Sequence, residues 1–226
     1  MIDLDPLPVA VTLLRVGIAS ALLVAVHRRD AAAAINALVS LGVALLPAVL
    51  VATAWLDPSP AVSLWLAVAG LLHSVGMLGP YDSVWWWDHL THTVSAALVA
   101  ALIYAALLVG SVRVPGGAAV ATVLYTFVVG VLWELVELLA RDLGEEYGVQ
   151  PVLVRYGRYD TAADLCFDVA AAVLVVVVDV RPFVPVVAQV GDVRALLHWT
   201  GAAILVGTVL VASLVVVVRA ASDTDD

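Results

Sequence analysis

Long apolar runs alternate with short polar or turn-forming segments along the whole chain. Each run has about the length that a helix needs to cross a bilayer, roughly 20 residues. Charged residues, prolines or glycines separate the runs. The pattern predicts helices over residues 8–26, 32–54, 61–78, 89–109, 117–140, 161–178 and 201–218. We therefore expect an all-α, polytopic transmembrane bundle of about seven spans, or six, that forms a single domain over residues 1–226.

The segments outside these runs carry different signals. Residues 181–199 contain Pro182 and Pro185, which predict a loop followed by an interfacial helix. The polar tail at 222–226 is predicted to be disordered. The first apolar run follows an acidic segment instead of a basic one, so we expect it to be a retained span and not a cleaved signal.

The composition supports a membrane protein and excludes two other classes. A mean hydropathy of +1.09 with only 13% charged residues lies outside the range of soluble domains. The net charge of −9 and the lack of a basic stripe argue against nucleic-acid binding. A seven-helix bundle invites comparison with retinal proteins, but the chain has no lysine to form the Schiff base. Cys166 is the single cysteine, which rules out an intrachain disulfide.

The arginines predict an orientation in the cell membrane. With seven alternating spans, one side receives Arg28, Arg29, Arg141, Arg155, Arg158 and Arg219, and the other receives Arg113, Arg181 and Arg194. The more basic side is expected to be cytoplasmic. The prediction is a multi-pass protein with its N-terminus outside the cell and its C-terminus in the cytoplasm.

Ionisable residues in or beside the apolar runs point to a functional site. A carboxylate at the centre of a membrane helix costs roughly 2.5–3.5 kcal/mol, so several of them need partners or solvent. Alternating topology places the helix ends that carry most of these residues on one side of the membrane. The set comprises His73, Asp88, His89, His92, Glu134, Glu137, Asp160, Asp164 and Asp168.

Spacing strengthens this interpretation, because residues three or four apart share one helix face. His89 and His92 are separated by three positions, Glu134 and Glu137 by three, and the aspartates from Asp160 to Asp168 by four. Three helices can therefore direct imidazoles and carboxylates into one pocket, as helical bundles do at metal sites.

Three motifs carry a resemblance to known families: WDHLTH at 87–92, ELVE at 134–137 and DTAAD at 160–164. They resemble the YjdF-type family of uncharacterised integral membrane proteins. Their order is also similar to that of VanZ-like proteins, in which Asp and His open one helix, Glu lies near the end of the next, and Arg and then Asp precede a Gly/Ala-rich helix. Arg158 and Asp164 are the counterparts here. The resemblance covers about residues 82–178 and implies a shared site without naming a reaction.

The site hypothesis assigns four ligands to a divalent cation, namely His89, His92, Glu134 and Asp164. Nitrogen and oxygen ligands without thiolate suit zinc, manganese or iron. Glu137 and Asp88 are the candidate catalytic residues. The remaining candidates are His73, Asp160, Asp168 and Arg158.

Structural roles compete with several of these assignments. Asp88 and Asp160 each precede an apolar run and are equally suited to cap a helix N-terminus. Glu137 lies four residues before Arg141, the spacing of a helical ion pair. Glu134 has no arginine at that spacing, which makes it the better candidate for a ligand or proton carrier.

Three functions fit this pattern. The first is a metal-dependent hydrolase acting on an amphiphilic or lipid substrate at the membrane interface. The second is a proton- or cation-coupled transporter that uses the same acids and histidines. The third is a non-catalytic scaffold in which the acids only cap and pair. The expected partners are membrane lipid and a small amphiphilic substrate.

Overall fold

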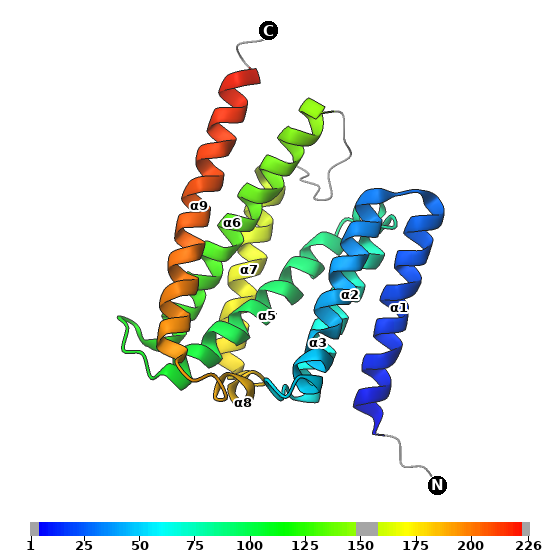
Figure 1. Cartoon of the computed structure of the whole chain (residues 1–226). Coiled ribbons are helices and arrows are strands. Elements are labelled where there is room, and N and C mark those ends of the chain that lie inside the picture. The colour runs from blue at the N-terminus through cyan, green and yellow to red at the C-terminus, as the bar shows by residue number, and fades with distance from the viewer. Residues whose placement is uncertain (1–4, 148–157, 223–226) are drawn as a thin grey trace.

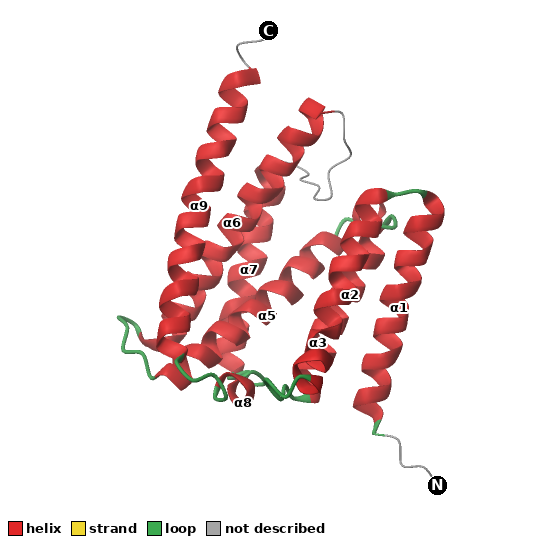
Figure 2. Cartoon of the chain, viewed as in Figure 1, coloured by secondary structure: helices red, strands yellow, loops and turns green. Residues whose placement is uncertain are grey.

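The computed structural model describes residues 5–147 and 158–222, and over these ranges the chain is helical with no strand (Figure 2). The helices are α1 (Pro6–Arg28), α2 (Ala31–Ala52), α3 (Pro60–Gly76), α4 (Pro80–Ser83), α5 (Trp87–Gly110), α6 (Gly117–Tyr147), α7 (Arg158–Val178), α8 (Val184–Val187) and α9 (Val193–Ser222). The predicted fold class, a polytopic helical bundle, is confirmed.

Polar residues between the apolar runs begin and end the helices. The Asp30 carboxylate accepts from the Ala33 amide at 2.9 Å and so caps α2. Pro60 occupies the first position of α3, where its missing N–H costs nothing. Within residues 5–147 and 158–222, six helices are long and apolar enough to cross a membrane, while α3 with 17 residues is shorter. At 1.5 Å per residue α3 spans roughly 25 Å, close to the thickness of a bilayer core.

The long helices alternate in direction, and the two termini lie at opposite ends of the bundle (Figure 1). We call the end with the α1–α2 turn, α4 and the C-terminus of α9 the upper end. The lower end holds α8 and the α5–α6 turn. Helices α1, α2 and α3 pack on one another, and α5 packs on α6 and α7. The contact between α3 and α5 joins these two groups.

The last helix is longer than the sequence predicts. It begins at Val193, so residues 193–199 are helical and continuous with the final span instead of forming a separate interfacial helix. The Asp192 carboxylate explains this start, because it accepts from the Ala195 amide at 2.9 Å. Only the short α8 occupies the preceding loop. Of the tail at 222–226, Ser222 ends α9 and the rest lies outside the described residues.

Arginines hold α9 at both ends. At the lower end the Arg194 Nε donates to the Gly110 carbonyl at 2.8 Å. At the upper end the Arg219 Nε donates to the Asp142 carboxylate of α6, also at 2.8 Å. Between these contacts α9 packs chiefly along α6.

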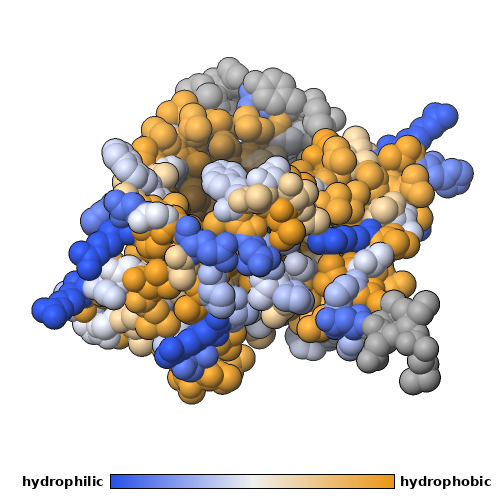
Figure 3. All heavy atoms as spheres, turned by 60° about the horizontal axis from the view of Figure 1, so that its bottom comes forward, coloured by the Kyte–Doolittle hydropathy of each residue, from blue (hydrophilic) through white to orange (hydrophobic). Residues whose placement is uncertain are grey.

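Hydrophilic side chains gather across the lower end of the molecule, whereas its flanks are hydrophobic (Figure 3). Arg113, Arg181 and Arg194 belong to loops or helix starts at this end. The apolar flanks agree with helices that face lipid. Arg15 lies within α1, and its Nε donates to the Ala44 carbonyl of α2 at 2.9 Å.

Candidate metal centre

Four helices bring the polar residues together near the upper end of the bundle. They are the C-terminal turn of α3, the N-terminal turns of α5 and α7, and the C-terminal half of α6. The alternation of direction along the chain produces this arrangement, since each of these segments lies next to a polar connection on the same side. The predicted convergence of three helices is therefore present, with α3 as a fourth contributor.

His89 of α5 pairs with α7. Its Nδ1 lies 2.9 Å from Oδ1 of Asp164, a carboxylate that is only 2% exposed. The imidazole stacks on Phe167 with ring centroids 4.8 Å apart, and the edge of Trp85 approaches it from another side. Aromatic packing and the hydrogen bond together fix the orientation of this ring.

His92, one turn further into the bundle, lies between two carboxylates. Its Nδ1 is 3.5 Å from Asp168 Oδ1 and its Nε2 is 4.0 Å from Asp88 Oδ1. Gly130 of α6 provides the space for Asp168, because a Cβ atom at position 130 would collide with Asp168 Oδ2. Only a glycine lets the carboxylate approach the α6 backbone this closely.

The two glutamates of α6 face the same region. Glu134 and Glu137 are both buried, and Glu137 Oε1 accepts from the Trp133 indole at 2.7 Å. Arg141, the alternative partner of Glu137, donates to Asp142 at 2.9 Å. The indole is thus a partner of Glu137 that the helical ion-pair pattern does not predict.

Three overlapping groups of these residues present ligand atoms within 4.8 Å of one another. They are Asp88, His92 and Asp164; His89, Asp160 and Asp164; and His92, Glu134 and Glu137. His92 and Asp164 each belong to two groups. The four predicted ligands do not form one such group within the described part of the chain, since His89 pairs with Asp164 while Glu134 lies with His92.

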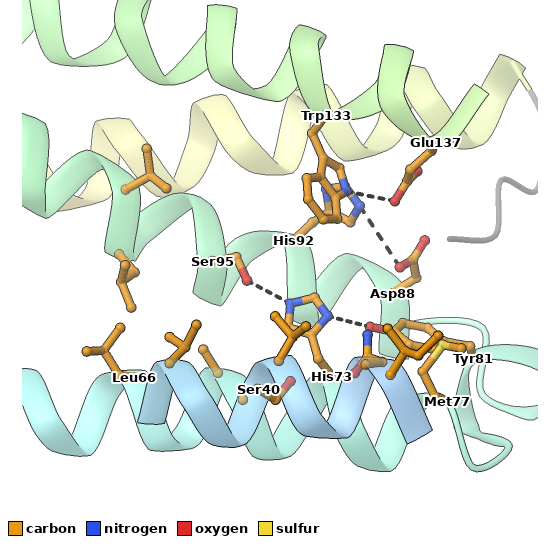
Figure 4. A pocket seen from close by; sticks show the side chains of 18 residues that line it. Ser40, Leu66, His73, Met77, Tyr81, Asp88, His92, Ser95, Trp133 and Glu137 are labelled. Atoms are coloured by element: carbon orange, nitrogen blue, oxygen red, sulfur yellow. Dashed lines mark hydrogen bonds and ion pairs between the residues drawn. The ribbon is translucent and has the colours of Figure 1, made fainter. Parts of the chain in front are cut away.

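His73 has a different environment from the other histidines. Its Nε2 is 3.0 Å from Ser95 Oγ, and its Nδ1 is 2.8 Å from the Tyr81 hydroxyl (Figure 4). That hydroxyl also donates to Thr91 Oγ1 at 3.3 Å. His73 belongs to none of the three groups, so it forms part of a hydrogen-bonded wall beside them.

The capping roles considered for two aspartates are wrong. Helix α5 begins at Trp87 with Trp86 as its cap, so Asp88 lies inside the first turn and its side chain turns towards His92. Helix α7 begins at Arg158, which likewise places Asp160 inside the first turn. Both residues belong to ligand groups, Asp88 with His92 and Asp160 with His89. The side chain of Arg158 lies outside the described residues.

A cavity of about 370 Å³ opens beside the cluster (Figure 4). Asp88, His92 and Glu137 line its polar end, while α2, α3 and α5 supply apolar walls. A second cavity of about 260 Å³ lies between α5 and α6 and shares His92 and Trp133 with the first. We call them the outer and inner lobes.

Several contributors to this region carry weak signals in the sequence. Gly130 lies one turn before Glu134, which marks it only as a small residue on the glutamate face. Tyr81 lies in a turn, and its pairing with His73 depends on tertiary structure. Thr126 is buried against the inner lobe two turns before Glu134. A search for small or hydroxyl residues on the same helix face finds Gly130 and Thr126, but not Tyr81.

Fold and site define a polytopic membrane protein with a buried cluster of histidines and carboxylates near one end of the bundle. The chain belongs to the family described as "Predicted membrane protein (DUF2238)", whose pattern matches residues 9–183. The match extends from α1 through α7, and α9 lies beyond it. It agrees with the resemblance to an uncharacterised integral membrane family. No curated protein and no solved structure matches the chain.

Proposed function

We propose that this protein is a metal-dependent hydrolase that acts on an amphiphilic substrate within the membrane. The observation that carries the proposal is the convergence of imidazoles and carboxylates from three helices in three overlapping groups. Structural caps and surface ion pairs do not require such convergence. Buried acids in a membrane helix are expensive, and a bound cation offsets that cost.

We assign the cation to the group formed by Asp88, His92 and Asp164, because it contains both residues that belong to two groups, His92 and Asp164. His92 Nε2 faces Asp88, while Nδ1 faces Asp168 on the opposite edge of the ring. Metal-bound histidines commonly use this pattern, in which one nitrogen ligates and the other donates to a carboxylate. Zinc ligands at 2.0–2.2 Å from the metal lie roughly 3.5 Å apart. The present spacing of up to 4.8 Å therefore requires a closure of about 1 Å.

Glu137 is the proposed base. It lies with His92 and Glu134 in the third group and lines the polar end of the outer lobe, where a substrate can approach. The cation would polarise a water molecule and an ester oxygen of the substrate. Glu137 would accept a proton from this water while the water oxygen attacks the ester centre. The protonated Glu137 would then donate that proton to the leaving oxygen of the substrate. The Trp133 indole holds the Glu137 carboxylate in position.

Elemental analysis of the purified protein tests the metal proposal. Wild-type protein loaded with zinc or manganese and then desalted should retain one or two equivalents, and His92→Ala should retain less than about a tenth of that amount. His198→Ala is the matched control, because this histidine is exposed on α9 near the lower end. Equal metal retention in wild type and His92→Ala would show that His92 is not a metal ligand.

A proton- or cation-coupled carrier is the second candidate, favoured by a separate observation. Hydrogen bonds connect Ser95, His73, Tyr81 and Thr91 into one chain along the wall of the cluster. Such a chain is suited to moving protons. Proteoliposomes with a pH-sensitive dye inside distinguish the two functions: Tyr81→Phe should slow acidification only if the protein carries protons.

For the orientation, we propose that the upper end faces the cytoplasm. The end that carries Arg28, Arg141 and Arg219 is the more basic one by sequence count. After Cys166→Ser, a cysteine at exposed Glu146 should react with an impermeant thiol reagent only after lysis. A cysteine at exposed Gly191, at the lower end, should react in intact cells. The reverse pattern would invert the orientation.

A further inference from the structure

The outer lobe lies between the two groups of helices. Ile35, Val39 and Val43 of α2 line one side, and Val99 of α5 and Trp133 of α6 line the other. Helix α2 packs on α1 and α3, whereas α6 packs on α5, α7 and α9. The lobe is thus a lateral groove at the junction of the groups and not a hollow within either of them.

The length of the groove matches one leaflet of a bilayer. Along α5 its lining extends from Asp88 to Val99, and along α3 from Leu66 to Met77, the residue after the helix, which is eleven residue steps in each case. Eleven residues of helix cover roughly 16 Å. Half of a hydrocarbon core is about 15 Å. The groove therefore has the length needed to reach from the interface at the upper end to about the middle of a membrane.

The groove has ionisable residues at its interfacial end and aliphatic residues at its deepest end, with the hydroxyls of Ser40 and Ser95 between them. Asp88, His92 and Glu137 lie at the first end, and Val43, Leu66 and Leu98 lie at the second. Its rim includes apolar residues that the described chain leaves uncovered, with Ile35 51% and Val39 60% exposed. In a protein whose flanks face lipid, this rim opens to acyl chains.

The inner lobe contains a buried hydroxyl group without a hydrogen-bond partner among the described residues. This hydroxyl belongs to Thr126, which is 1% exposed and lines the lobe. A buried hydroxyl without a partner is unfavourable, so water or a polar group of a ligand is expected there. The inner lobe shares the lining residues Val99 and Trp133 with the groove, so these two side chains lie between the lobes.

We propose that the groove binds one hydrocarbon chain of a membrane lipid from the leaflet at the upper end and places its head group at the cation site. The occupant follows from the match to one leaflet, the uncovered apolar rim and the polar end beside the cluster. The position of the head group rests on the proposed function, whereas the position of the chain does not. The substrate class is accordingly a long-chain lipid ester that enters sideways from the bilayer.

Photo-crosslinking tests the position of the chain. The full-length protein is placed in vesicles that contain a phosphatidylcholine with a diazirine at the terminal carbon of one acyl chain. Peptide mapping should find labels near Val43, Leu66 and Leu98, in addition to general labelling of lipid-facing helices such as α9. Val99→Trp should lower groove labelling about tenfold, because a packed indole leaves no space for a chain. Labelling of α9 should not change.

Two further variants keep the test decisive. Val43→Trp blocks the groove from α2 and should have the same effect if Val99→Trp does not fold. Leu174→Trp is the matched control, since Leu174 is exposed on α7 and lines neither lobe. Groove labelling that is unchanged by a folded groove-filling variant would overturn the proposal.

Metal content separates this inference from the proposed function. Val99→Trp should retain wild-type metal, while His89→Ala/His92→Ala should lose metal and keep its groove label. If the double variant keeps metal while Val99→Trp loses the label, the cation site fails and the chain site stands. The opposite pair of results overturns the chain site alone.

Discussion

The two ends of the bundle handle charge in different ways. At the lower end Asp179 is exposed and pairs with Arg181 at 2.6 Å and with the Tyr104 hydroxyl at 2.9 Å. Asp192 caps α9 there. At the upper end Asp164, Asp168 and Glu134 are buried. Asp164 and Asp168 face histidines instead of arginines.

This difference separates structural charges from candidate functional ones. The lower carboxylates are exposed to solvent, and Asp179 also has a permanent countercharge in Arg181, while Asp192 caps a helix. In the cluster, the carboxylates of Asp164 and Asp168 are buried and meet histidines of another helix, as Asp164 does with His89. Burial without a permanent countercharge is costly, and functional sites are where such a cost is commonly maintained.

The largest effect is expected for Asp164→Asn. Asp164 belongs to two of the three ligand groups, so the amide should weaken metal binding at least as much as loss of an outer-shell partner, about 10–100-fold. Metal titration with a competing chelator measures this. Asp179→Asn, which removes the same charge from the lower end, should bind metal as the wild type does. Equal losses of metal affinity in both variants would show that the two ends of the bundle do not differ in function.

Gly130→Ala should have the next largest effect. The new methyl group would displace Asp168 from the α6 backbone, destabilise the fold by about 1–3 kcal/mol and weaken metal binding about tenfold. Gly207→Ala on α9 is the control, because its nearest neighbour would be an ordinary contact at 3.8 Å. Chemical unfolding and metal titration should separate the two variants. Identical behaviour would show that Asp168 does not position His92.

The two glutamates of α6 should differ in kind. Glu134→Gln is expected to lower metal occupancy through His92, with which Glu134 shares a ligand group. Glu137→Gln should keep metal and lose activity about 100-fold, as expected for a general base. The amide preserves shape in both cases, so folding should be near normal. Metal content and hydrolysis of a long-chain ester in mixed micelles give the two readouts. Loss of metal in both variants would make Glu137 a ligand.

The smallest effect is expected from the exposed pair at the lower end. The hydrogen bonds from Arg181 and Tyr104 hold the pKa of the Asp179 carboxyl below its usual range. A carboxyl whose pKa is lowered by folding stabilises the folded state when the pH is above its pKa in the unfolded chain. This stabilisation is lost as the pH falls through the lowered pKa of the folded state. Asp179→Asn should remove that part of the pH dependence and change the melting temperature little. A large stability loss at neutral pH would show that this pair is not peripheral.

Hydropathy alone places the long helices well, because each lipid-facing run must be continuous and is bounded by turn residues. It fails where polar residues continue a helix. Pro182 and Pro185 led to a loop and a separate interfacial helix over residues 181–199, whereas residues from Val193 onward belong to α9. The predicted fifth span ended at residue 140, before Arg141 and Asp142, although α6 continues to Tyr147. The side chains of these two residues reach partners or solvent without interrupting the backbone ladder.

Spacing along a helix predicted which acids and histidines share a face, and the structure brings those residues near one another. It did not predict their pairing across helices. Whether Asp164 meets His89 or His92 depends on the rotation and depth of α7 against α5, which the sequence of either helix alone does not specify. Gly130 has no side chain, and this lets the Asp168 carboxylate lie against the backbone of α6.

The two arginine contacts of α9 have a mechanical consequence. Arg194 grips the end of α5 and Arg219 grips α6, so a slide of α9 by one helical turn, 5.4 Å, would break both at once. These two contacts therefore favour a single register of α9 against α5 and α6. Asp142 lies five residues beyond Glu137 on the same helix, so the contact with Arg219 joins the end of α9 to the segment of α6 that carries the glutamates.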